Sequence, residues 1–257
     1  IPLPHICTLH PPAHINVYTD GSWQFPLRHY FALGGAGVWW PCRTLAAHRA
    51  SQAEIDLAHI RVDQGGLRLF TALGGYSGSS TRTELAAGII AVSCHGPVHI
   101  DSDSEMFVNH ARVVLQQIKD GTIARRNWKI TSDGDLWYHF VQIATANNPD
   151  SIRLTWVKGH ATDEHVVQGT TTEVNRKGNS VADEVADMGV KVHGEATYEL
   201  ARLYTARHHS YTKLMRNVAI HIVEAHMIHR ELLRIAEAKE KAQQSGGKEL
   251  CAYVPLE

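Results

Sequence analysis

The order of β-prone and helix-prone segments limits the fold of this chain more than any other feature. Glycine pairs at 34–35 and 65–66 are typical of turns, and three β-prone runs lie around them. A helix at 45–55 is expected as an insertion between the second and third runs. The runs predict an antiparallel meander of strands at 15–19, 36–40 and 67–73.

The rest of the first 194 residues alternates between helix-like and strand-like patterns. Short β-prone runs at 98–100 and 152–157 predict two further strands. Apolar residues recur at three- and four-residue steps in the predicted helices, at 85–93, 106–118, 136–146 and 181–192. Because strands and helices alternate after an initial meander, the sequence predicts an α/β fold.

Four acidic residues stand at the ends of predicted strands or at the starts of predicted helices. Asp20 and Asp103 end β-prone runs, whereas Glu84 and Asp183 lie in the first turns of apolar helices. Carboxylates that are brought close together repel one another, and their pKa values rise unless cations neutralise them. Because carboxylate oxygens suit Mg2+ or Mn2+, the four acids together predict a site for hard divalent cations. Two such ions about 3.5–4 Å apart support in-line phosphoryl displacement.

Each acid also has an ordinary structural explanation. Asp20 precedes a glycine in a common turn dipeptide. Glu84 has the spacing of a capping box with Thr81, and a second capping box would begin at Ser102. Asp183 would then be a surface acid on the last helix. These explanations account for each acid by itself, but they do not explain why all four occur in this order and setting.

Six short motifs resemble those of the ribonuclease H family and occur in the same order along the chain. The resemblance extends over roughly residues 15–194. The motifs are Tyr-Thr-Asp-Gly-Ser at 18–22, Arg-Thr-Glu-Leu at 82–85, Asp-Ser at 103–104, Asp-Leu-Trp at 135–137, Trp-Val-Lys-Gly-His-Ala at 156–161 and Asn-x-x-x-Asp at 179–183.

The resemblance implies a mixed five-stranded sheet flanked by helices, and an enzyme that cuts the RNA strand of an RNA–DNA hybrid. It also implies two Mg2+ ions, for which Mn2+ can substitute. Asp20 would bridge both ions, Glu84 and Asp103 would complete one site, and Asp183 would complete the other. His160 would take the role of the family's flexible catalytic histidine. In a chain with 18 histidines, a loop histidine also has an ordinary surface explanation.

The same resemblance assigns a set of mostly polar residues to substrate binding. Cellular enzymes of the family carry paired asparagines where this chain has Ser80 and Thr81, and Glu105 replaces their usual glutamine. Their basic handle is reduced to a short segment that includes Arg125 and Arg126. The expected substrate-binding residues are Gly21, Ser22, Ser80, Thr81, Arg82, Ser104, Trp128, Lys129 and Asn179.

The charge balance argues against a protein that holds nucleic acid by net charge alone. The chain has 25 Lys and Arg against 26 Asp and Glu, and its isoelectric point is about 7.1. Either the basic residues are concentrated locally, or a neighbouring domain, such as a fused reverse transcriptase, provides most of the binding to nucleic acid. The long loop after His160 most resembles retrotransposon-encoded domains, which predicts a reverse-transcription polyprotein as the context.

Three segments are expected along the chain. Residues 1–14 contain four prolines and are expected to form a linker before a catalytic domain at 15–194. In residues 195–257, apolar residues recur at helical spacing, which predicts a C-terminal extension of one long amphipathic helix or two shorter ones. The ordinary explanation of this helical extension is that it packs on its own domain or on the rest of a parent polypeptide. The alternatives are association, or nucleic-acid contact through Arg202, Arg207, Lys213 and Arg216.

Cysteine spacing and hydropathy limit the setting of the protein. The four cysteines show no Cys-x-x-Cys spacing, which favours reduced thiols and an intracellular protein. No apolar run approaches the ~20 residues of a membrane span, and no signal peptide is visible. Because the sequence lacks an initiator methionine, we expect a piece of a longer polypeptide.

The sequence as a whole predicts a metal-dependent endoribonuclease of the ribonuclease H type. Two other classes remain open: a DNA-cutting nuclease on the same fold, and a retired enzyme that serves as a nucleic-acid-binding or structural module. The motifs at 135–137 and 156–161 favour ribonuclease H over a DNA-cutting enzyme. The presence of all four acids argues against a retired enzyme.

Overall fold

The computed structural model separates into two compact units. The first extends to Thr205 and the second begins at Ala206. The described residues are 3–27, 30–44, 50–63, 65–74, 78–122 and 127–244.

Three antiparallel strands form the first half of the sheet, as the glycine-punctuated meander predicts. β1 (Val17–Gln24) pairs with β2 (Leu33–Trp40), and β2 pairs with β4 (Gly66–Leu73). β1 and β2 are longer than the sequence pattern predicts, because their ladder continues through the glycines and polar residues next to the apolar runs.

An additional strand, β3 (His59–Asp63), pairs antiparallel with β4. The sheet therefore has six strands in the order β3-β4-β2-β1-β5-β6, and the expected count of five is corrected to six. Ile60 and Val62 of β3 are 39% and 53% exposed. This edge strand therefore buries little apolar surface, and its sequence carries little of the pattern that reveals buried strands.

β5 (Val98–Ser102) and β6 (Ile152–Trp156) complete the sheet beyond β1 and run parallel to it. The sheet is thus mixed, and the predicted α/β fold is confirmed. In the ladder between β1 and β5, Thr19 is aligned with Ser102. The next residue after each of these two is an acid, Asp20 within β1 and Asp103 directly after β5, so this register brings both acids to the same end of the two strands.

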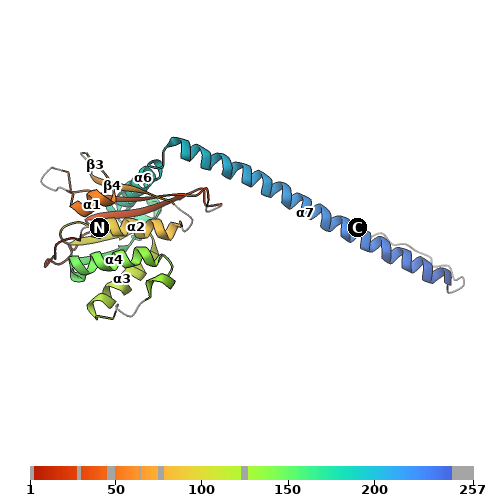
Figure 1. Cartoon of the computed structure of the whole chain (residues 1–257), viewed down its shortest axis with the longest axis horizontal. Helices are drawn as coiled ribbons and strands as arrows, with labels where there is room; N and C mark the ends of the chain where they lie inside the picture. Colours follow the sequence, from red (N-terminus) through yellow and green to blue (C-terminus); the bar gives the residue numbers. More distant parts are fainter. Residues whose placement is uncertain are drawn as a thin grey trace. The chain divides into compact units, whose positions relative to one another are not determined.

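Three helices cover one face of the sheet and build the main hydrophobic core. They are α2 (Ser80–Val92), α3 (Glu105–Lys119) and α4 (Gly134–Asn147), which lie beside one another in Figure 1. Val17 and Val38 point into this core and are fully buried. The helices predicted at 85–93, 106–118 and 136–146 are therefore confirmed, with α2 beginning five residues earlier than its apolar run.

The opposite face of the sheet carries α6 (Glu173–Lys191). Tyr18 and Ala182 belong to a separate buried cluster on this side. A Cβ atom at Gly37 of β2 would lie 2.2 Å from the backbone nitrogen of Ala186, so only glycine permits this approach. The close contact holds the backbone of α6 directly against the sheet and brings Asp183 near the edge where Asp20 lies.

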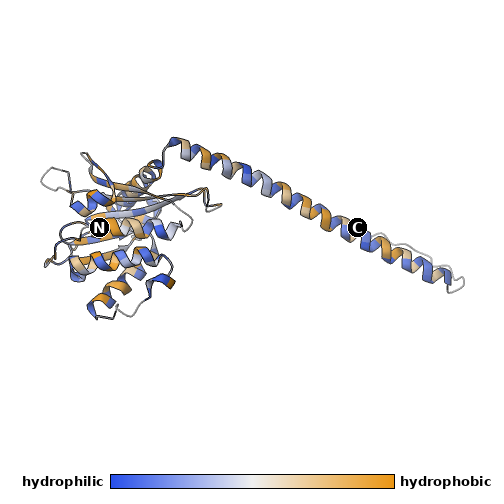
Figure 2. Ribbon diagram, in the orientation of Figure 1, coloured by the Kyte–Doolittle hydropathy of each residue, from blue (hydrophilic) through white to orange (hydrophobic). Residues whose placement is uncertain are grey.

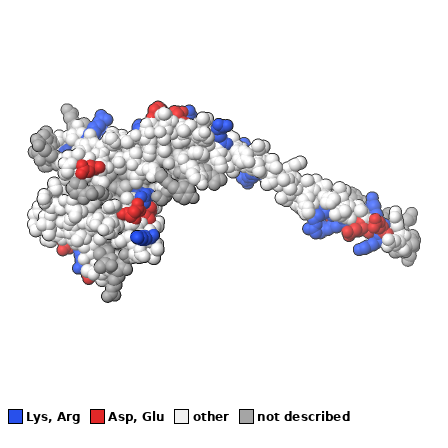
Figure 3. Space-filling model, in the orientation of Figure 1, with Lys and Arg blue, Asp and Glu red and all other residues white. Residues whose placement is uncertain are grey.

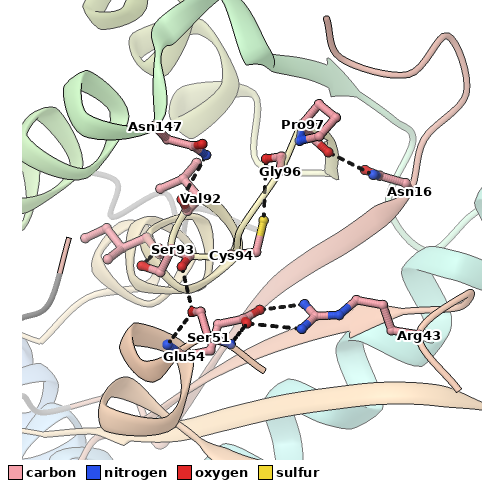
Figure 4. Close-up of polar contacts among 11 residues, drawn as sticks. Asn16, Arg43, Ser51, Glu54, Val92, Ser93, Cys94, Gly96, Pro97 and Asn147 are labelled. Atoms are coloured by element: carbon pink, nitrogen blue, oxygen red, sulfur yellow. Dashed lines mark hydrogen bonds and ion pairs between the residues drawn. The ribbon is translucent and has the colours of Figure 1, made fainter. Parts of the chain in front are cut away.

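A buried ion pair joins two parts of the insertion between β2 and β4, and a serine hydroxyl links the insertion to α2. The helix expected at 45–55 falls partly outside the described residues, and α1 (Gln52–Leu57) begins after the cap residue Ser51. Glu54 is fully buried and accepts hydrogen bonds from Arg43 at 2.6 Å and from the Ser51 backbone at 2.7 Å. The Ser51 hydroxyl donates to a main-chain carbonyl at the end of α2 at 2.8 Å (Figure 4).

The described N-terminal residues 3–14 form neither helix nor strand, but they contact the domain. The Cys7 backbone donates to the carbonyl of Asn147 at 3.0 Å, and the His99 ring hydrogen-bonds the carbonyl of Pro12 at 3.0 Å. The shorter elements in the connections are two 3-10 turns, η3 (Trp128–Ile130) and η4 (Pro149–Ser151), and α5 (Asp163–Val167).

The C-terminal extension is one continuous helix, α7 (Glu195–Gln244), rather than two shorter ones. Its first turns belong to the first unit, where Ala201 is buried with Leu33 and Val190. From His209 onward, every described residue of the helix is exposed. Within the described residues, the helices are either too short or too polar to cross a membrane.

Candidate active site

Asp20 lies in β1 at the centre of the candidate site. It is 7% exposed, and the Gly21 backbone donates to its Oδ1 at 2.7 Å. A Cβ atom at Gly21 would lie 2.5 Å from the backbone nitrogen of Glu84. Glycine at this position therefore allows the start of α2 to approach β1, which sets Glu84 beside Asp20.

Glu84 is buried without the partner that a capping role would give it. The cap of α2 is Ser79, whose hydroxyl accepts from the Arg82 backbone at 3.1 Å. The capping box expected between Thr81 and Glu84 is therefore wrong. Glu84 is 8% exposed, and its Oε2 atom has no hydrogen-bond partner.

Asp103 follows β5 and is half-buried. Its carbonyl accepts from the Trp156 indole at 2.9 Å, and its Oδ2 atom accepts from the Asn179 amide at 3.4 Å. The cap of α3 is Ser104, which accepts from the Phe107 backbone at 3.3 Å, so a capping box that begins at Ser102 is also wrong. Asp103 is thus oriented by contacts from β6 and α6, and it does not cap α3.

The structure brings three of the four predicted acids together. Ligand oxygens of Asp20, Glu84 and Asp103 all lie within 4.8 Å of one another. Asp183 is not part of this group in the described chain, but its charge is near enough to raise the pKa of Asp20. It lines an adjacent cleft of about 450 Å³ together with His160 and Asn179.

The acids strongly perturb one another. Burial, and then the negative charges of Asp103 and Asp183, raise the pKa of Asp20 from 3.8 to about 7, against the opposing hydrogen bond from Gly21. Burial and the charges of Asp20 and Asp103 also raise the pKa of Glu84 well above its ordinary value. This is the expected behaviour of carboxylates that converge without a neutralising cation.

The donor set fits hard divalent cations. All ligand atoms in the group are carboxylate oxygens, the type that Mg2+ and Mn2+ prefer. Opposite oxygens around Mg2+ lie about 4.2 Å apart, which is close to the spread of the three carboxylates. The buried and unpartnered Oε2 of Glu84 is a further acceptor that a cation would satisfy.

His160 lies in the loop after β6 and is exposed. It has φ +46, a left-handed conformation that is uncommon for residues other than glycine and is enriched at functional sites. A Cβ atom at the preceding residue, Gly159, would lie 2.2 Å from Oδ2 of Asp103. Glycine at that position therefore lets this loop pack against the acidic group and keeps His160 at the adjacent cleft.

The predicted substrate-binding residues differ in what already engages them. The Ser22 hydroxyl donates to Asp187 at 2.7 Å, and Arg82 donates to Asp135 at 2.8 Å and to Asp133 at 3.3 Å. Arg82 therefore ties the start of α2 to the start of α4.

The remaining predicted contacts fall into three environments. Ser80 and Lys129 are exposed, whereas Thr81 and Trp128 are half-buried, and Trp128 packs on the main core. Gly21, Ser104 and Asn179 are tied to the acidic group or its supporting elements, as described above. Arg125 and Arg126 of the reduced basic handle lie outside the described residues.

One buried acid was missed by sequence reasoning. Asp101 lies two residues before Asp103 and is 1% exposed, and neither of its carboxylate oxygens has a hydrogen-bond partner. Burial and the charge of Asp103 raise the pKa of Asp101 to about 8. The available signal was the two-residue spacing, which puts both acids on one face of a strand.

Comparison with known proteins identifies the family. The sequence model of the RNase H family matches residues 12–191, about 70% of the chain, and this span contains all four acids and His160. The chain belongs to the ribonuclease H family. It is therefore an enzyme of the ribonuclease H class, in which activity depends on divalent metal ions. The resemblance of the six sequence motifs to this family is confirmed.

Several solved structures are similar to this ribonuclease H chain. The PFV RNase H domain in solution has 21% identity and a TM-score of 0.43, covering 68% of this chain and 93% of that one. LC9-RNase H1, a type 1 RNase H with the type 2 active-site motif, has 20% identity and a TM-score of 0.43, covering 80% and 85%. The foamy viral protease-reverse transcriptase in complex with dsDNA has 18% identity and a TM-score of 0.43, covering 68% and 93%. No curated protein matches the sequence.

Proposed function

We propose that this ribonuclease H hydrolyses the RNA strand of RNA–DNA hybrids by a two-metal-ion mechanism. The observation that carries the proposal is the convergence of Asp20, Glu84 and Asp103 within 4.8 Å. Asp183 and His160 line the neighbouring cleft and supply the other functional groups. The catalytic domain would extend over 15–194, between an N-terminal linker and the C-terminal helical extension.

Four carboxylates would hold the metal ions. Asp20 would serve both ions, Glu84 and Asp103 one, and Asp183 the other. Mg2+ is the proposed ion, with Mn2+ as a substitute, because the ligands are oxygen atoms alone. When bound, such a pair of ions activates a water molecule and stabilises the departing oxygen in phosphoryl displacement.

The remaining contribution of the chain is to hold these carboxylates in place. The Gly21 N–H fixes one oxygen of Asp20, and the Asn179 amide orients Asp103 from α6. Glu84 is fixed by its position near the start of α2, whose backbone touches β1. Sites supported by such rigid elements keep their ligands in the productive geometry.

His160 is proposed to move a proton at the mouth of the cleft. A histidine ring can accept or donate a proton near neutral pH, which suits the release of a product oxygen. Its exposed position allows the ring to reach solvent. It would therefore assist turnover without holding a metal ion.

Substrate selection would depend on the polar residues around the acidic group. The 2′-hydroxyl distinguishes RNA from DNA, and short side chains such as Ser80 and Thr81 can hydrogen-bond to it. We propose Gly21, Ser22, Ser104 and Asn179 as further neighbours of the scissile strand. Arg82, Trp128 and Lys129 would support the other strand, with Arg82 acting from its ion pair with Asp135.

The chain alone is expected to bind the RNA–DNA hybrid with low affinity. The net charge is −1, and Glu105 places an exposed negative charge in the first turn of α3. Attraction to phosphates normally depends on clustered Lys and Arg. We therefore propose that a neighbouring or fused domain, such as a reverse transcriptase in a retroelement polyprotein, strengthens binding.

The proposal is tested by Mg2+ and Mn2+ titration with a hybrid labelled separately on each strand. The expected result is metal-dependent cleavage of the RNA strand alone, with an all-DNA duplex of the same sequence left intact. Cutting of the DNA duplex would assign a DNA nuclease instead. Metal-dependent hybrid binding without any cleavage would assign a retired enzyme.

A further inference from the structure

The second unit of the molecule contains an apolar stripe with the spacing of a coiled coil. Eight residues of α7 follow one another at alternating steps of three and four, so that each half of the set repeats every seven residues. We call this stripe the seam. It consists of Tyr211, Leu214, Val218, His221, Ala225, Ile228, Leu232 and Ile235.

The seam is exposed in the single chain. Its six large apolar side chains are 40–62% exposed. In Figure 2, apolar residues recur along α7 between polar ones. Lys213, Arg216 and the other charged residues between Tyr211 and Ile235 all lie at positions outside the seam.

Charge defines the ends of the seam. The two positions that would continue the seven-residue repeat are Arg207 and Lys239, and both are basic. Between Arg216 and Arg230 the only charged residue is Glu224, apart from histidines. Figure 3 likewise shows charged side chains gathered toward the two ends of this part of the helix. The apolar stripe is therefore a bounded feature of 25 residues rather than a general excess of apolar side chains.

A seven-residue repeat indicates what can cover the seam. In a straight helix of 3.6 residues per turn, such a repeat drifts by about 20° per heptad, so the stripe winds slowly around the helix. A second helix with the same repeat can follow this path by supercoiling. The flat face of a globular domain cannot follow it over several heptads.

The length of the seam restricts the partner further. Residues 211–235 extend over about 36 Å along the helix axis. Among the described residues of the first unit, the longest other helices are α6 with 19 residues and α3 with 15, and both use their apolar faces within the domain. A second copy of α7 has the required length and repeat by identity.

We propose that α7 associates with α7 of a second copy of this chain along the seam. The six large side chains, with Met215 and Ile222 at its margin, each bury on the order of 100 Å² on full burial. Together they reach ~800 Å² per helix, which is the size of a specific protein interface. The contact area is thus sufficient for stable association.

Association would join two nuclease domains in one assembly. Two domains held together bind one long hybrid with an effective concentration set by the connection between them. This would offset the weak grip expected from a net charge of −1. The association itself does not depend on the proposed reaction, because it needs only the helix.

Sedimentation velocity of the full chain over a range of concentrations tests the proposal. The expected mass rises with concentration to at least twice the 28.5 kDa of one chain. Val218→Glu places a charge in the seam and should hold the chain at the mass of one copy. Val223→Glu introduces the same change about 140° away around the helix and should leave association intact.

Two further measurements exclude a trivial explanation. Glutamate has good helix propensity, so far-UV circular dichroism should show the same helix content for both variants. Cleavage of a short hybrid by each variant should match the parent, since neither residue belongs to the proposed active site. A chain that stays at 28.5 kDa at all concentrations would overturn the proposal, and so would equal responses to the two substitutions. A monomer whose hybrid binding falls on charge reversal at Lys213 and Arg216 would instead make α7 a nucleic-acid contact.

Discussion

Two places in the catalytic unit bury carboxylates, and they differ in what balances the negative charge. Glu54 is fully buried, but Arg43 donates to both of its oxygens at 2.6 and 3.1 Å, and the Ser51 backbone donates at 2.7 Å (Figure 4). Glu84 is nearly as buried, yet its neighbours are Asp20 and Asp103, and its Oε2 atom has no partner. Arg43 balances the charge of Glu54, whereas the neighbours Asp20 and Asp103 add to the negative charge around Glu84.

The difference separates a structural acid from a ligand. A buried charge is tolerated only when it is paired or bound to a metal ion. Glu54 is paired within the fold and binds Arg43 and Ser51, and the Ser51 hydroxyl joins the insertion between β2 and β4 to the end of α2. At the group around Asp20, burial and the negative charges of neighbouring acids raise the pKa values of Asp20 and Glu84, so these neighbours do not balance the charge. We propose that bound cations balance this charge.

The largest expected effect comes from removing one charge at the proposed metal site. Asp20→Asn or Asp103→Asn keeps the side-chain shape and should lower hybrid cleavage by on the order of 10³-fold, since metal ions supply several kcal/mol of transition-state stabilisation. Without metal, each variant should be at least as stable as the parent, because repulsion is relieved. Cleavage assays and thermal melts measure the two effects. Asp56→Asn, on the exposed surface of α1, is the matched control. Cleavage at the parental rate would show that the ligand assignment is wrong.

The opposite pattern is expected at the structural acid. Glu54→Gln leaves Arg43 without its charged partner and should lower the free energy of unfolding by about 3 kcal/mol. Cleavage by the folded fraction should be unchanged. Urea denaturation measures the loss, and Glu199→Gln, which removes an exposed ion pair with Arg202, should lower the free energy of unfolding far less. Similar losses in the two variants would mean that the buried pair does not hold the insertion.

The third prediction concerns pH in the absence of metal. The pKa of Asp20 is about 7 in the folded chain against an ordinary value of 3.8, so the folded state binds its proton more tightly. The resulting stability is fully present below pH 3.8 and is lost as pH rises through about 7. Other carboxylates add their own slopes, so the measured quantity is the difference between the parent and Asp20→Asn. That difference should change with pH over this window when no metal is present. A pH-independent difference would contradict the raised pKa.

Most of the fold follows from patterns that a single chain displays. The meander, the parallel strands β5 and β6 and the four core helices each carry apolar residues at the spacing of their element. The sequence did not predict β3, because its apolar side chains are exposed. Its backbone ladder with β4 is what defines it as a strand. An edge strand held by backbone hydrogen bonds leaves little trace in hydropathy.

The site was less predictable than the fold because burial and local partners decide it. The spacing of Thr81 and Glu84 suits a capping box, but Ser79 provides the cap and releases Glu84 for the acidic group. Arg82 remains a predicted substrate contact, and the sequence did not reveal that the tertiary fold places Asp135 beside it, 53 residues away. Long-range pairs of this kind cannot be read from local spacing.

The smallest expected effect on cleavage comes from His160, which is neither a structural acid nor a proposed metal ligand. His160 is exposed beside the acidic group and holds no ion in the proposed mechanism. His160→Ala should slow steady-state turnover by about 10–100-fold, at the low end of what proton transfer contributes. Metal affinity and stability should not change, because the carboxylates and their supporting contacts remain. Steady-state and single-turnover cleavage separate proton transfer from product release.

His95→Ala is the matched control for this prediction. His95 is an exposed loop histidine that precedes β5, whereas Asp103 follows that strand, so the two lie at opposite ends of it. Its loss should leave turnover unchanged. If His160→Ala also turned over at the parental rate, the histidine would be a surface residue, and catalysis would depend on the acids and their cations alone. A loss of metal affinity in His160→Ala would instead place the ring among the ligands and change the donor set of the site.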